Sequence, residues 1–450
     1  MRKAYLLLFP LFFTIVSFSQ SRTILKDNVL NAGPLLGYCE MKEARIWIQT
    51  KSEADVFIEY FSVHNDKVKF RTNSKRTNRQ EGFTANMIAD QVLPGTRYKY
   101  DVFADGKKVI VPYPTEFLTQ EDWKFKKDPA PFTAAFGSCT YINETETDRP
   151  GIPYGGGYHI FNTIADQKPD VMLWGGDNIY LRPADWGSRA GFFHRYTYSR
   201  SLPDVQKLFA ACPQLAIWDD HDFGPNDANG SFFLKPVSHE TFRLFWPNPP
   251  MVQFTGGPSI CTQFEFNGID FFTLDNRSFR TEIMRDSTRI QIFGMEQIEW
   301  LINNLKFSQS PFKMVLVGGQ ILNTAKVYEN FSNYPEERQY LLRRIQEENI
   351  KGVIFLSGDR HHSEISKLVF DDGQVIFEIT SSPLTSGAGS TDRSSEKNTW
   401  RVAGSLIQQR NFALLSFSGS FKNRILDIRF HDSDGKPLFS YNIQEKDIYK

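Results

Sequence analysis

The sequence predicts an α/β domain, layered from β-sheets and helices, behind a smaller all-β domain. Two observations predict this architecture. Residues 31–119 read as short strands separated by turns. From Phe132 onward, apolar strands alternate with helix-like stretches, which is the pattern of an α/β or layered α+β fold. The length of 450 residues fits two or three domains at about 100–200 residues each.

Residues 1–20 are predicted to be a signal peptide. A basic start, Arg2 and Lys3, precedes an apolar stretch that ends near Val16, and small residues then offer a cleavage site. The apolar stretch is shorter than the roughly 20 residues that a membrane-spanning helix needs, and no second such stretch follows. We therefore expect an exported protein, periplasmic or secreted, with no membrane span.

Residues 31–119 predict an N-terminal β-sandwich domain. The segments “EARIWIQT” and “ADVFIEYF” alternate or run apolar at strand length, and an Asp-Gly turn follows the next strand. The segment “LPGTRYKYDV” is similar to a fibronectin type III strand and turn, so we expect an immunoglobulin- or fibronectin III-like sandwich. Residues 120–131, “QEDWKFKKDPAP”, are polar and contain proline, and they read as a linker to a second domain of residues 132–450.

The second domain is predicted from strands and helices that alternate along the chain. The apolar segments of strand length are “FTAAFGSC”, “DVMLWGGD”, “QLAIWDDHD”, “IDFFTLDNR”, “KMVLVGGQ” and “GVIFLSGD”. The helix-like segments between them include “GYHIFNTIADQ”, “GMEQIEWLINNLKF” and “PEERQYLLRRIQEEN”. The stretch “TSGAGSTDRSSEKNTW” is rich in serine and glycine and reads as a surface loop.

Reactive side chains follow four of these strands. Ligands of open α/β sheets bind at the carboxyl ends of strands, so the four strand ends could converge on one place. Carboxylate and phenolate oxygens suit hard cations such as Fe(III), Mg, Mn or Ca, whereas imidazole and thiolate suit Fe or Zn. The sequence therefore predicts a metal site, whose candidate ligands are Cys139, Asp177, Tyr180, Asp219, Asp220, Asn226, Asp359 and His361.

Each of these residues also has an ordinary explanation when taken alone. A Gly-Asp pair after a strand is usually a turn, Tyr180 reads as a half-buried aromatic, and Asn226 reads as a turn residue. The segment “WDDHD” is harder to explain in this way, because burying its charges costs several kcal/mol unless cations compensate them. We do not expect a helix there, because the crowded acids repel one another. The joint occurrence of these groups at strand ends favours the metal site.

Charge and cysteine content limit the other classes of function. The formal net charge is zero, which gives no support for a nucleic-acid or polyanion partner. The four cysteines are widely spaced and form no CxxC pair, so they do not make a disulfide-dense scaffold, although one disulfide is compatible with the spacing. For Cys39, Cys212 and Cys261 we expect buried free thiols.

The order of the motifs resembles that of the calcineurin-like metallophosphatases. The variant seen here, with “GSC” in place of the usual D-x-H, and with “GDNIY”, “WDDHDFGPND”, “FFTLDNRSFR” and “SGDRHHSE”, resembles the alkaline phosphatase D family. A β-sandwich before the catalytic domain also fits that family. The resemblance covers about residues 32–445. One departure is “VLVGGQILN”, which offers Gln320 and Asn323 where many metallophosphatases carry a histidine.

The resemblance implies two metal sites that share one ligand. Asp177 would bridge the metals, and Cys139, Tyr180 and His361 would complete an Fe(III) site. A Ca(II) ion, or another divalent cation such as Mn, Mg or Zn, would be held by Asp219 or Asp220, Asn226 and Asp359.

The resemblance also implies a mechanism of hydrolysis. Fe(III) lowers the pKa of a bound water, so hydroxide forms at neutral pH and attacks the phosphorus. His221 would protonate the leaving alkoxide or steady the phosphoryl oxygens. Arg360 and Arg280 would clamp phosphate, with surface salt bridges as their ordinary alternative. His362 would orient His361 from behind.

Two functions from different classes follow. The first is an exported, metal-dependent hydrolase of phosphoric monoesters or diesters, including phospholipase-like activity on small-molecule or lipid phosphate esters, acting as a monomer. The alternative is a non-catalytic surface binding protein with a degenerate metallophosphatase domain. The presence of Asp177, Tyr180, His221, Asp359 and His361 favours the enzyme.

Overall fold

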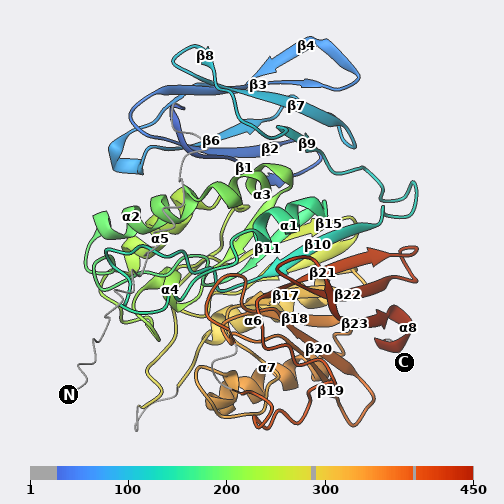
Figure 1. The fold of residues 1–450 in the computed structure, drawn as a ribbon. Coiled ribbons are helices and arrows are strands. Elements are labelled where there is room, and N and C mark those ends of the chain that lie inside the picture. Colours follow the sequence, from blue (N-terminus) through green and yellow to red (C-terminus); the bar gives the residue numbers. More distant parts are fainter. Residues whose placement is uncertain (1–27, 285–289, 389–391, 449–450) are drawn as a thin grey trace, which may run out of the picture.

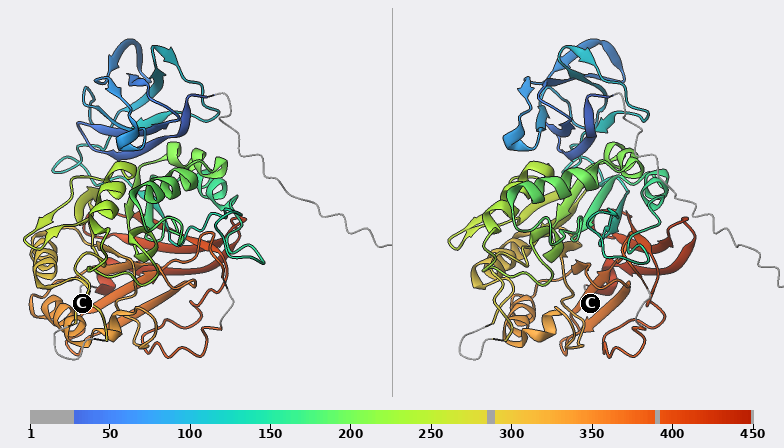
Figure 2. Two further views of the ribbon diagram at one scale, coloured as in Figure 1. Left: turned by 90° about the vertical axis from the view of Figure 1, so that its left-hand side faces the viewer. Right: turned by 60° about the vertical axis from the view of Figure 1, so that its left-hand side comes forward.

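The protein consists of stacked layers of sheets and helices. A computed structural model describes residues 28–284, 290–388 and 392–448 (Figure 1). The predicted signal peptide, residues 1–20, lies outside these residues. Within the described ranges, no helix is long and apolar enough to cross a membrane. Figures 1 and 2 show two small sheets at one end of the molecule, followed by helices, two large sheets and a second helical layer.

The N-terminal part is all-β, as predicted. One sheet has the order β1-β2-β6, with β1 (Leu30–Cys39), β2 (Ala44–Thr50) and β6 (Thr84–Ala89). The other has β4 (Asn65–Arg71), β3 (Asp55–Ser62), β7 (Arg97–Ala104) and β8 (Lys107–Lys108), with β5 (Lys75–Arg76) on β3 and β9 (Glu116–Leu118) on β7. All pairs are antiparallel, and the facing side chains, such as Ile46 and Ile58, form one buried cluster. The immunoglobulin or fibronectin III type stays a prediction.

The first large sheet has the order β12-β11-β10-β21-β22-β23. Its strands are β10 (Phe132–Gly137), β11 (Val171–Gly175), β12 (Gln214–Ile217), β21 (Asn411–Ser418), β22 (Ile425–Asp432) and β23 (Pro437–Gln444). The strands β10, β11 and β12 are parallel, and the last three strands add to β10 in antiparallel order.

The second large sheet has the order β15-β16-β17-β18-β20-β19. Its strands are β15 (Thr262–Phe266), β16 (Ile269–Thr273), β17 (Lys313–Val317), β18 (Val353–Ser357), β19 (Glu364–Val369) and β20 (Val375–Thr380). The four central strands are parallel, and the two edge strands are antiparallel to their neighbours. The six apolar segments that predicted strands form β10, β11, β12, β16, β17 and β18.

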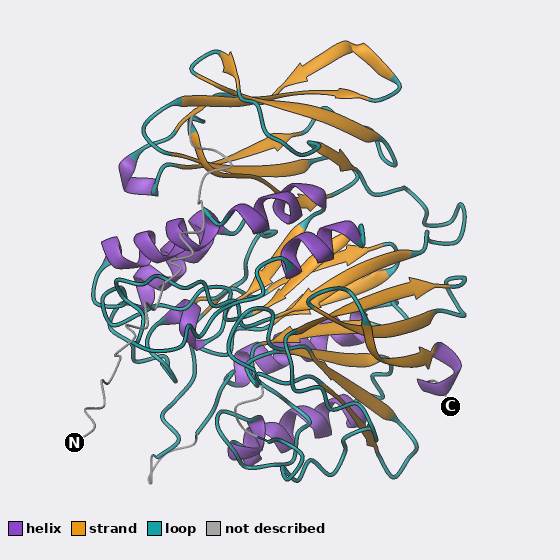
Figure 3. Cartoon of the chain, viewed as in Figure 1, coloured by secondary structure: helices purple, strands orange, loops and turns teal. Residues whose placement is uncertain are grey.

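Helices cover the outer faces of both large sheets (Figures 1 and 3). On the first sheet lie α1 (Ile160–Asp166), α2 (Arg189–Arg200), α3 (Pro203–Ala211) and α5 (Lys235–Phe245), and on the second lie α6 (Met295–Phe307) and α7 (Pro335–Glu347). The remaining elements are short: α4 (Asp220–Phe223), α8 (Glu445–Ile448), β13 (Gln253–Phe254), β14 (Gly257–Pro258) and the 3₁₀ turns η1 (Arg79–Glu81) and η2 (Phe331–Asn333). The three helix-like segments of the sequence form α1, α6 and α7.

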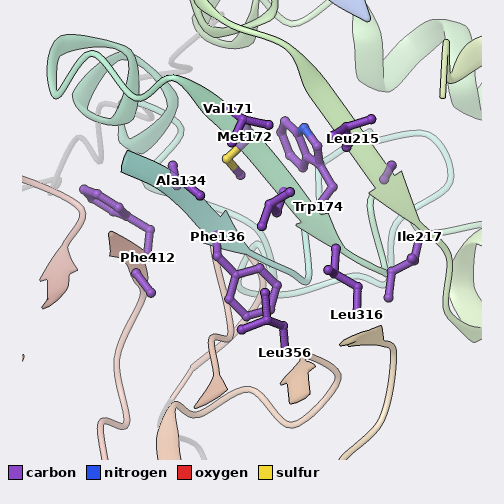
Figure 4. Close-up of a cluster of buried hydrophobic side chains, with 14 of the residues drawn as sticks. Ala134, Phe136, Val171, Met172, Trp174, Leu215, Ile217, Leu316, Leu356 and Phe412 are labelled. Carbon is purple, nitrogen blue, oxygen red and sulfur yellow. The ribbon is translucent and has the colours of Figure 1, made fainter. Parts of the chain in front are cut away.

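The core explains why the central strands are apolar on both faces. In β17, Met314 and Leu316 pack between the two large sheets, whereas Val315 and Val317 pack beneath α6 and α7. Figure 4 shows Leu316 and Leu356 of the second sheet facing Phe136 and Ile217 of the first. Strands that are buried on both faces read as continuous apolar runs, because neither side chain set meets water.

The N-terminal sheet β1-β2-β6 rests on the helices of the first large sheet. Leu35 and Trp47 belong to the same buried cluster as Phe209 and Phe245, and the Trp47 indole donates to the carbonyl of Leu244 (2.8 Å). The linker of residues 120–131 contains no helix or strand but is anchored, because Trp123 is buried and packs against Phe421. All four cysteines are buried and unpaired.

Candidate metal centre

The predicted metal site lies where parallel strands of both large sheets end. Cys139, Asp177 and Asp219 follow β10, β11 and β12, and Asp359 and His361 follow β18. Because parallel strands end at a common edge, side chains separated by many positions of sequence meet there.

The backbone at four of the predicted ligands is left-handed. The φ angles are 61° at Cys139, 53° at Asp177, 66° at Asp359 and 54° at His361. Side chains other than glycine rarely adopt this conformation, and it persists only where the surrounding structure holds it. Such strain collects at functional sites, so its presence at four predicted ligands marks these strand ends as a built site.

The first cluster contains a thiol, a carboxylate, a phenol and an imidazole. The Asp177 Oδ2 atom lies 3.6 Å from Cys139 Sγ and 3.1 Å from Tyr180 Oη. The Tyr180 Oη atom lies 3.1 Å from His361 Nε2. Ligands bonded to one ion at about 2.0–2.3 Å are spaced in this way. Cys139, Asp177 and His361 are thus one group that could hold a metal ion, with Tyr180 beside them.

Three further side chains position this cluster, and sequence reasoning missed all three. Ser382 donates to Cys139 Sγ (3.2 Å), and Ser386 donates to Tyr180 Oη (3.0 Å). The Tyr154 hydroxyl lies 2.9 Å from His361 Nδ1, on the side of the ring opposite the cluster. Ser386 belongs to the stretch that read as a surface loop, and Tyr154 lies in no motif of the sequence, so only the long-range contacts reveal them.

The electrostatics of the first cluster favour a cation. Burial, and then the Asp177 charge, raise the pKa of both Cys139 and Tyr180. Burial, followed by the neighbouring carboxylates Asp220 and Asp219, raises the pKa of Asp177. The pKa of His361 is lowered to about 4 by burial, and also by the positive charges of His221 and Arg393. A bound cation would reverse the rise at the thiol and phenol and make them anionic ligands.

A second cluster lies beside the first and shares Asp177. The ligand atoms of Asp177, Asp220 and His221 form one group, and those of Asp219, Asp220 and Glu329 form another, with all atoms of each group within 4.8 Å of one another. Glu329 is a further residue that sequence reasoning missed. Because Asp177 belongs to both clusters, its carboxylate is placed to bridge two ions.

The segment “WDDHD” was expected to avoid helical structure, and this expectation is wrong. Residues 220–223 form the short helix α4, with Asp219 as its N-cap in a capping box. Asp222 accepts hydrogen bonds from the backbone N–H groups of Asp219 (3.0 Å) and Asn178 (3.1 Å). Free N–H groups at a helix N-terminus stabilise acids there, which offsets the repulsion that the expectation rested on. Asp222 therefore accepts hydrogen bonds from the backbone. Burial raises its pKa to about 7.

Asp219 and Asp220 both lie close to side chains that stabilise a negative charge. Asp219 Oδ1 accepts from Asn276 Nδ2 (2.7 Å) and from Arg277 Nε (2.6 Å). Burial would raise the pKa of Asp220, but the charges of His221 and Arg277 lower it. The pKa of Asp359 is raised to about 7, first by burial and then by the charges of Asp219 and Asp220.

Unpaired buried atoms in this cluster test whether a cation fits. Among the described residues, four polar atoms here are buried without a hydrogen-bond partner: Asp219 Oδ2, Asp220 Oδ1, His221 Nδ1 and Asn276 Oδ1. Buried polar atoms are almost always paired, so unpaired ones call for an unseen ligand. Three of the four are oxygens of carboxylate or amide groups, which are donors for hard divalent cations. The residue set therefore fits a metal, and Asn276 is a candidate ligand that sequence reasoning did not single out.

Three predicted residues are not among the clustered ligand atoms. Asn226 is exposed on the loop after α4. Arg280 forms an ion pair with Glu329 and donates to Tyr334 Oη (2.9 Å). Arg360 donates to Gln320 (2.8 Å), Asn330 (2.7 Å) and Glu396 (2.7 Å). Both arginines that were predicted to bind phosphate therefore already bind acceptor groups of the protein itself.

His362 and Gln320 belong to a buried network behind the site. His362 Nδ1 lies 3.1 Å from the Arg360 carbonyl, and His362 Nε2 lies 3.8 Å from Glu364. Gln320 Nε2 donates to Glu364 and Thr380, both at 2.9 Å. Gln320, at the position where many metallophosphatases carry a histidine, therefore braces the network.

Comparison with known proteins gives consistent likenesses. A model of the PhoD-like phosphatase family matches residues 135–425, and a model of a domain of unknown function (DUF7800) matches residues 27–121. The curated protein alkaline phosphatase D of Bacillus subtilis (strain 168) is 24% identical over 371 residues, which are 68% of this chain and 61% of that protein. The chain thus spans less than two thirds of the length of this relative.

Two solved structures share the fold over most of the chain. A structure of PhoD matches with a TM-score of 0.75 at 17% identity, covering 92% of this chain and 89% of that one. The purple acid phosphatase PPD1 from yellow lupin (Lupinus luteus) seeds matches with a TM-score of 0.67 at 13% identity, covering 93% and 75%. At these identities the two structures establish the architecture alone.

Proposed function

Because this chain belongs to the PhoD-like phosphatase family, whose model matches residues 135–425, we propose that it is a metal-dependent phosphoric ester hydrolase. The observation that carries the proposal is the pair of clusters joined by Asp177. One cluster adds Cys139 and His361 to it, and the other adds Asp220 and His221. Fe(III) in the first and Ca(II), or another divalent cation such as Mn, Mg or Zn, in the second are the proposed occupants.

The protein supplies charge, position and protons to this reaction. When bound, the metals act as Lewis acids and lower the pKa of a water molecule that serves as nucleophile. The ligands would come from the residues already described: Cys139, Asp177, Tyr180 and His361 for iron, and Asp219, Asp220, Asn226, Asp359 and the newly found Asn276 for the divalent cation.

His221 is the proposed proton donor to the leaving group. Its ring lies 4.1 Å from that of Tyr180, centroid to centroid, and its Nδ1 atom is buried without a partner. An imidazole that stands beside the reacting atoms with a free nitrogen can move a proton to the departing oxygen. The same position would also allow His221 to bind a cation, and the metal content of a variant separates the two roles, as described below.

The proposed substrates are small-molecule or lipid phosphate esters, and the proposed setting is outside the cytoplasm. Export is supported by the basic and apolar pattern of residues 1–20. Family membership supports a phosphate ester as substrate, and we propose that the protein acts as a monomer.

Metal analysis combined with turnover tests the proposal. Protein purified without chelators is expected to contain iron and a divalent cation and to hydrolyse p-nitrophenyl phosphate or bis-p-nitrophenyl phosphate, with loss of activity in a chelator. Thiolate or phenolate on Fe(III) gives a visible absorption band, which Tyr180→Phe should shift. A metal-replete protein that hydrolyses neither ester would favour the non-catalytic binding protein. A colourless, active enzyme would refute the iron assignment alone.

A further inference from the structure

Neither of the two arginines that were predicted to clamp the substrate is free to bind it. A phosphate monoester carries about two negative charges near neutral pH, and planar guanidinium groups are well suited to bind its oxygens in pairs. Arg360 and Arg280 were the predicted clamps. Arg360 is 2% exposed and bonds to three internal acceptors, and Arg280 is paired with Glu329. Both guanidinium groups are therefore committed to the protein itself.

Arg393 is a third arginine at the same place, and its guanidinium is not committed in this way. Its nearest acid is Glu396, with Nη1 and Oε2 at 3.9 Å, and its side chain is 17% exposed. Glu396 is already occupied, because it accepts from Arg360 Nη2 (2.7 Å) and from Asn323 Nδ2 (2.8 Å). Within the described parts of the chain, the Arg393 guanidinium has no acceptor at hydrogen-bond distance.

Two contacts fix Arg393 in position. Its guanidinium carbon lies 4.7 Å from the centroid of the Tyr328 ring, and that of Arg360 lies 5.1 Å from the same ring. Its backbone N–H donates to Gln408 Oε1 (2.6 Å). Stacking on an aromatic face orients a guanidinium plane and leaves its edge, which carries the N–H groups, free to bind an anion.

Arg393 also lies close to the metal clusters. Its partner ring, Tyr328, stacks with Arg360, which directly follows the predicted ligand Asp359. The Arg393 charge is one of those that act on the His361 imidazole. Tyr328 is 62% exposed, so its ring lies at the surface, beside Arg360 and Arg393.

We propose that Arg393, held against Tyr328, binds the phosphate group of the substrate at the rim of the metal centre. The inference rests on the proposed function and assigns to Arg393 the role that the resemblance implied for Arg360 and Arg280. Two of its N–H groups would donate to two non-bridging phosphoryl oxygens of the substrate. The contact acts on substrate affinity, and it favours a dianionic monoester over a monoanionic diester.

Titration of inorganic phosphate into the metal-loaded protein, followed by calorimetry, tests the proposal directly. Arg393→Ala should weaken phosphate binding about ten- to a hundred-fold, which is the scale of a hydrogen-bonded charge pair, without loss of metal. Arg393→Lys keeps the positive charge but loses the paired N–H groups of the guanidinium. Its phosphate affinity should lie between that of the unchanged protein and that of Arg393→Ala. The matched control is Arg343→Ala in α7, an exposed arginine paired with Glu347. It should bind phosphate as the unchanged protein does.

Turnover gives a second readout. Arg393→Ala should raise KM for p-nitrophenyl phosphate more than KM for bis-p-nitrophenyl phosphate and leave kcat within a few-fold. Unchanged phosphate affinity in Arg393→Ala, or loss of its metals, would overturn the inference. If the unchanged protein binds phosphate through Arg393 but hydrolyses neither ester, the proposed function fails and the inference stands.

Discussion

Asp177 differs from the other ligands because its carboxylate belongs to both clusters. Tyr180 and Cys139 contact its Oδ2 atom, while its Oδ1 atom accepts from the backbone N–H of His221 (3.3 Å). A side chain with one oxygen toward each cluster has no substitute among its neighbours.

Asp177→Ala is therefore expected to lose both metals and all activity. His221→Ala should keep its metals but turn over at least about a hundred-fold more slowly, which is the usual scale for a general acid. Metal content and kcat of the two variants, measured side by side, check the assignment. If His221→Ala loses metal as completely as Asp177→Ala, His221 is a ligand and not the proton donor.

The Tyr154 hydroxyl lies 2.9 Å from His361 Nδ1 and so leaves Nε2 as the nitrogen that would face a bound metal. Tyr154→Phe should lower metal affinity about ten- to a hundred-fold, because partners of a ligating histidine tune its orientation and basicity. Competition with a chelator measures this affinity without relying on activity. Tyr141→Phe is the control, since its ring packs 5.0 Å from that of Tyr154 but its hydroxyl binds Asp148 (2.8 Å). Equal metal affinity in the two variants would contradict the role of Tyr154.

At the scale of elements, glycines at the strand ends let neighbouring segments of the chain lie close to one another. A Cβ atom on Gly318, just after β17, would lie 2.5 Å from both Asp219 Oδ2 and Asn276 Nδ2. Contacts of that length do not occur in proteins, so a side chain here must displace the Asp219 carboxylate. Next to it, a Cβ on Gly319 would meet its nearest atom at 3.8 Å.

Gly318→Ala should therefore reduce binding of the divalent cation while the fold persists, and Gly319→Ala should leave it unchanged. Metal content and circular dichroism of the two variants provide the measurement. The adjacent pair separates crowding at the carboxylate from any general effect of alanine in this loop. Full metal content in Gly318→Ala would show that the Asp219 carboxylate does not need its observed position.

The helix α5 carries a buried histidine that should make stability depend on pH. The pKa of His239 is lowered to about 4, mainly by burial, and its Nε2 lies 2.9 Å from Ser278 Oγ. The unfolded chain takes up this proton near pH 6.5 and the folded chain only near pH 4, so acid favours unfolding across that window. The loss reaches about 3 kcal/mol by pH 4, from about 1.4 kcal/mol for each pKa unit.

His239→Gln cannot titrate and should lose less stability than the unchanged protein between pH 6.5 and pH 4. Denaturant unfolding at several pH values measures the difference. His64→Gln, in the exposed turn between β3 and β4, serves as the control and should follow the unchanged protein. Parallel curves for His239→Gln and the unchanged protein would contradict the assignment.

For the whole molecule, the N-terminal part has a buried cluster of its own but also contributes Leu35 and Trp47 to the core of the large sheets. Trp47, which is fully buried, packs 5.9 Å from Phe245 and donates to the Leu244 carbonyl. The backbone N–H of Gly33 donates to Gln206 (2.9 Å) across the same boundary. Apolar contacts of this kind couple two parts of a chain, so we expect them to unfold together.

Trp47→Ala should lower the free energy of unfolding by about 3–5 kcal/mol, as large-to-small changes of buried aromatics do. Calorimetry should show one transition at a lower temperature, because the loss affects the shared core. Val68→Ala, at a position 47% exposed in β4, should change the transition little. Two separate transitions in Trp47→Ala would show that the two parts are only loosely coupled.

Local patterns in the sequence determined the strands and most candidate ligands. Apolar runs followed by polar groups, with a glycine between them in four of the six, predicted β10, β11, β12, β16, β17 and β18, because both sheet faces are buried in this fold. The helices α2, α3 and α5 and the strands β19 to β23 were not singled out. Strand β21 takes its place in the first large sheet by pairing with β10, which lies far away in sequence, so no local pattern indicates that place.

The sequence by itself determined that Cys139, Asp177, Tyr180, Asp220 and His361 stand at strand ends and suit a metal. Only the tertiary structure decided that Arg360 and Arg280 are already paired, and that Asn276, Glu329 and Tyr154 lie beside the predicted ligands. The physical reason is distance along the chain. Tyr154 meets His361 across 207 positions and Ser386 meets Tyr180 across 206, and such contacts arise from the stacking of sheets rather than from any local pattern.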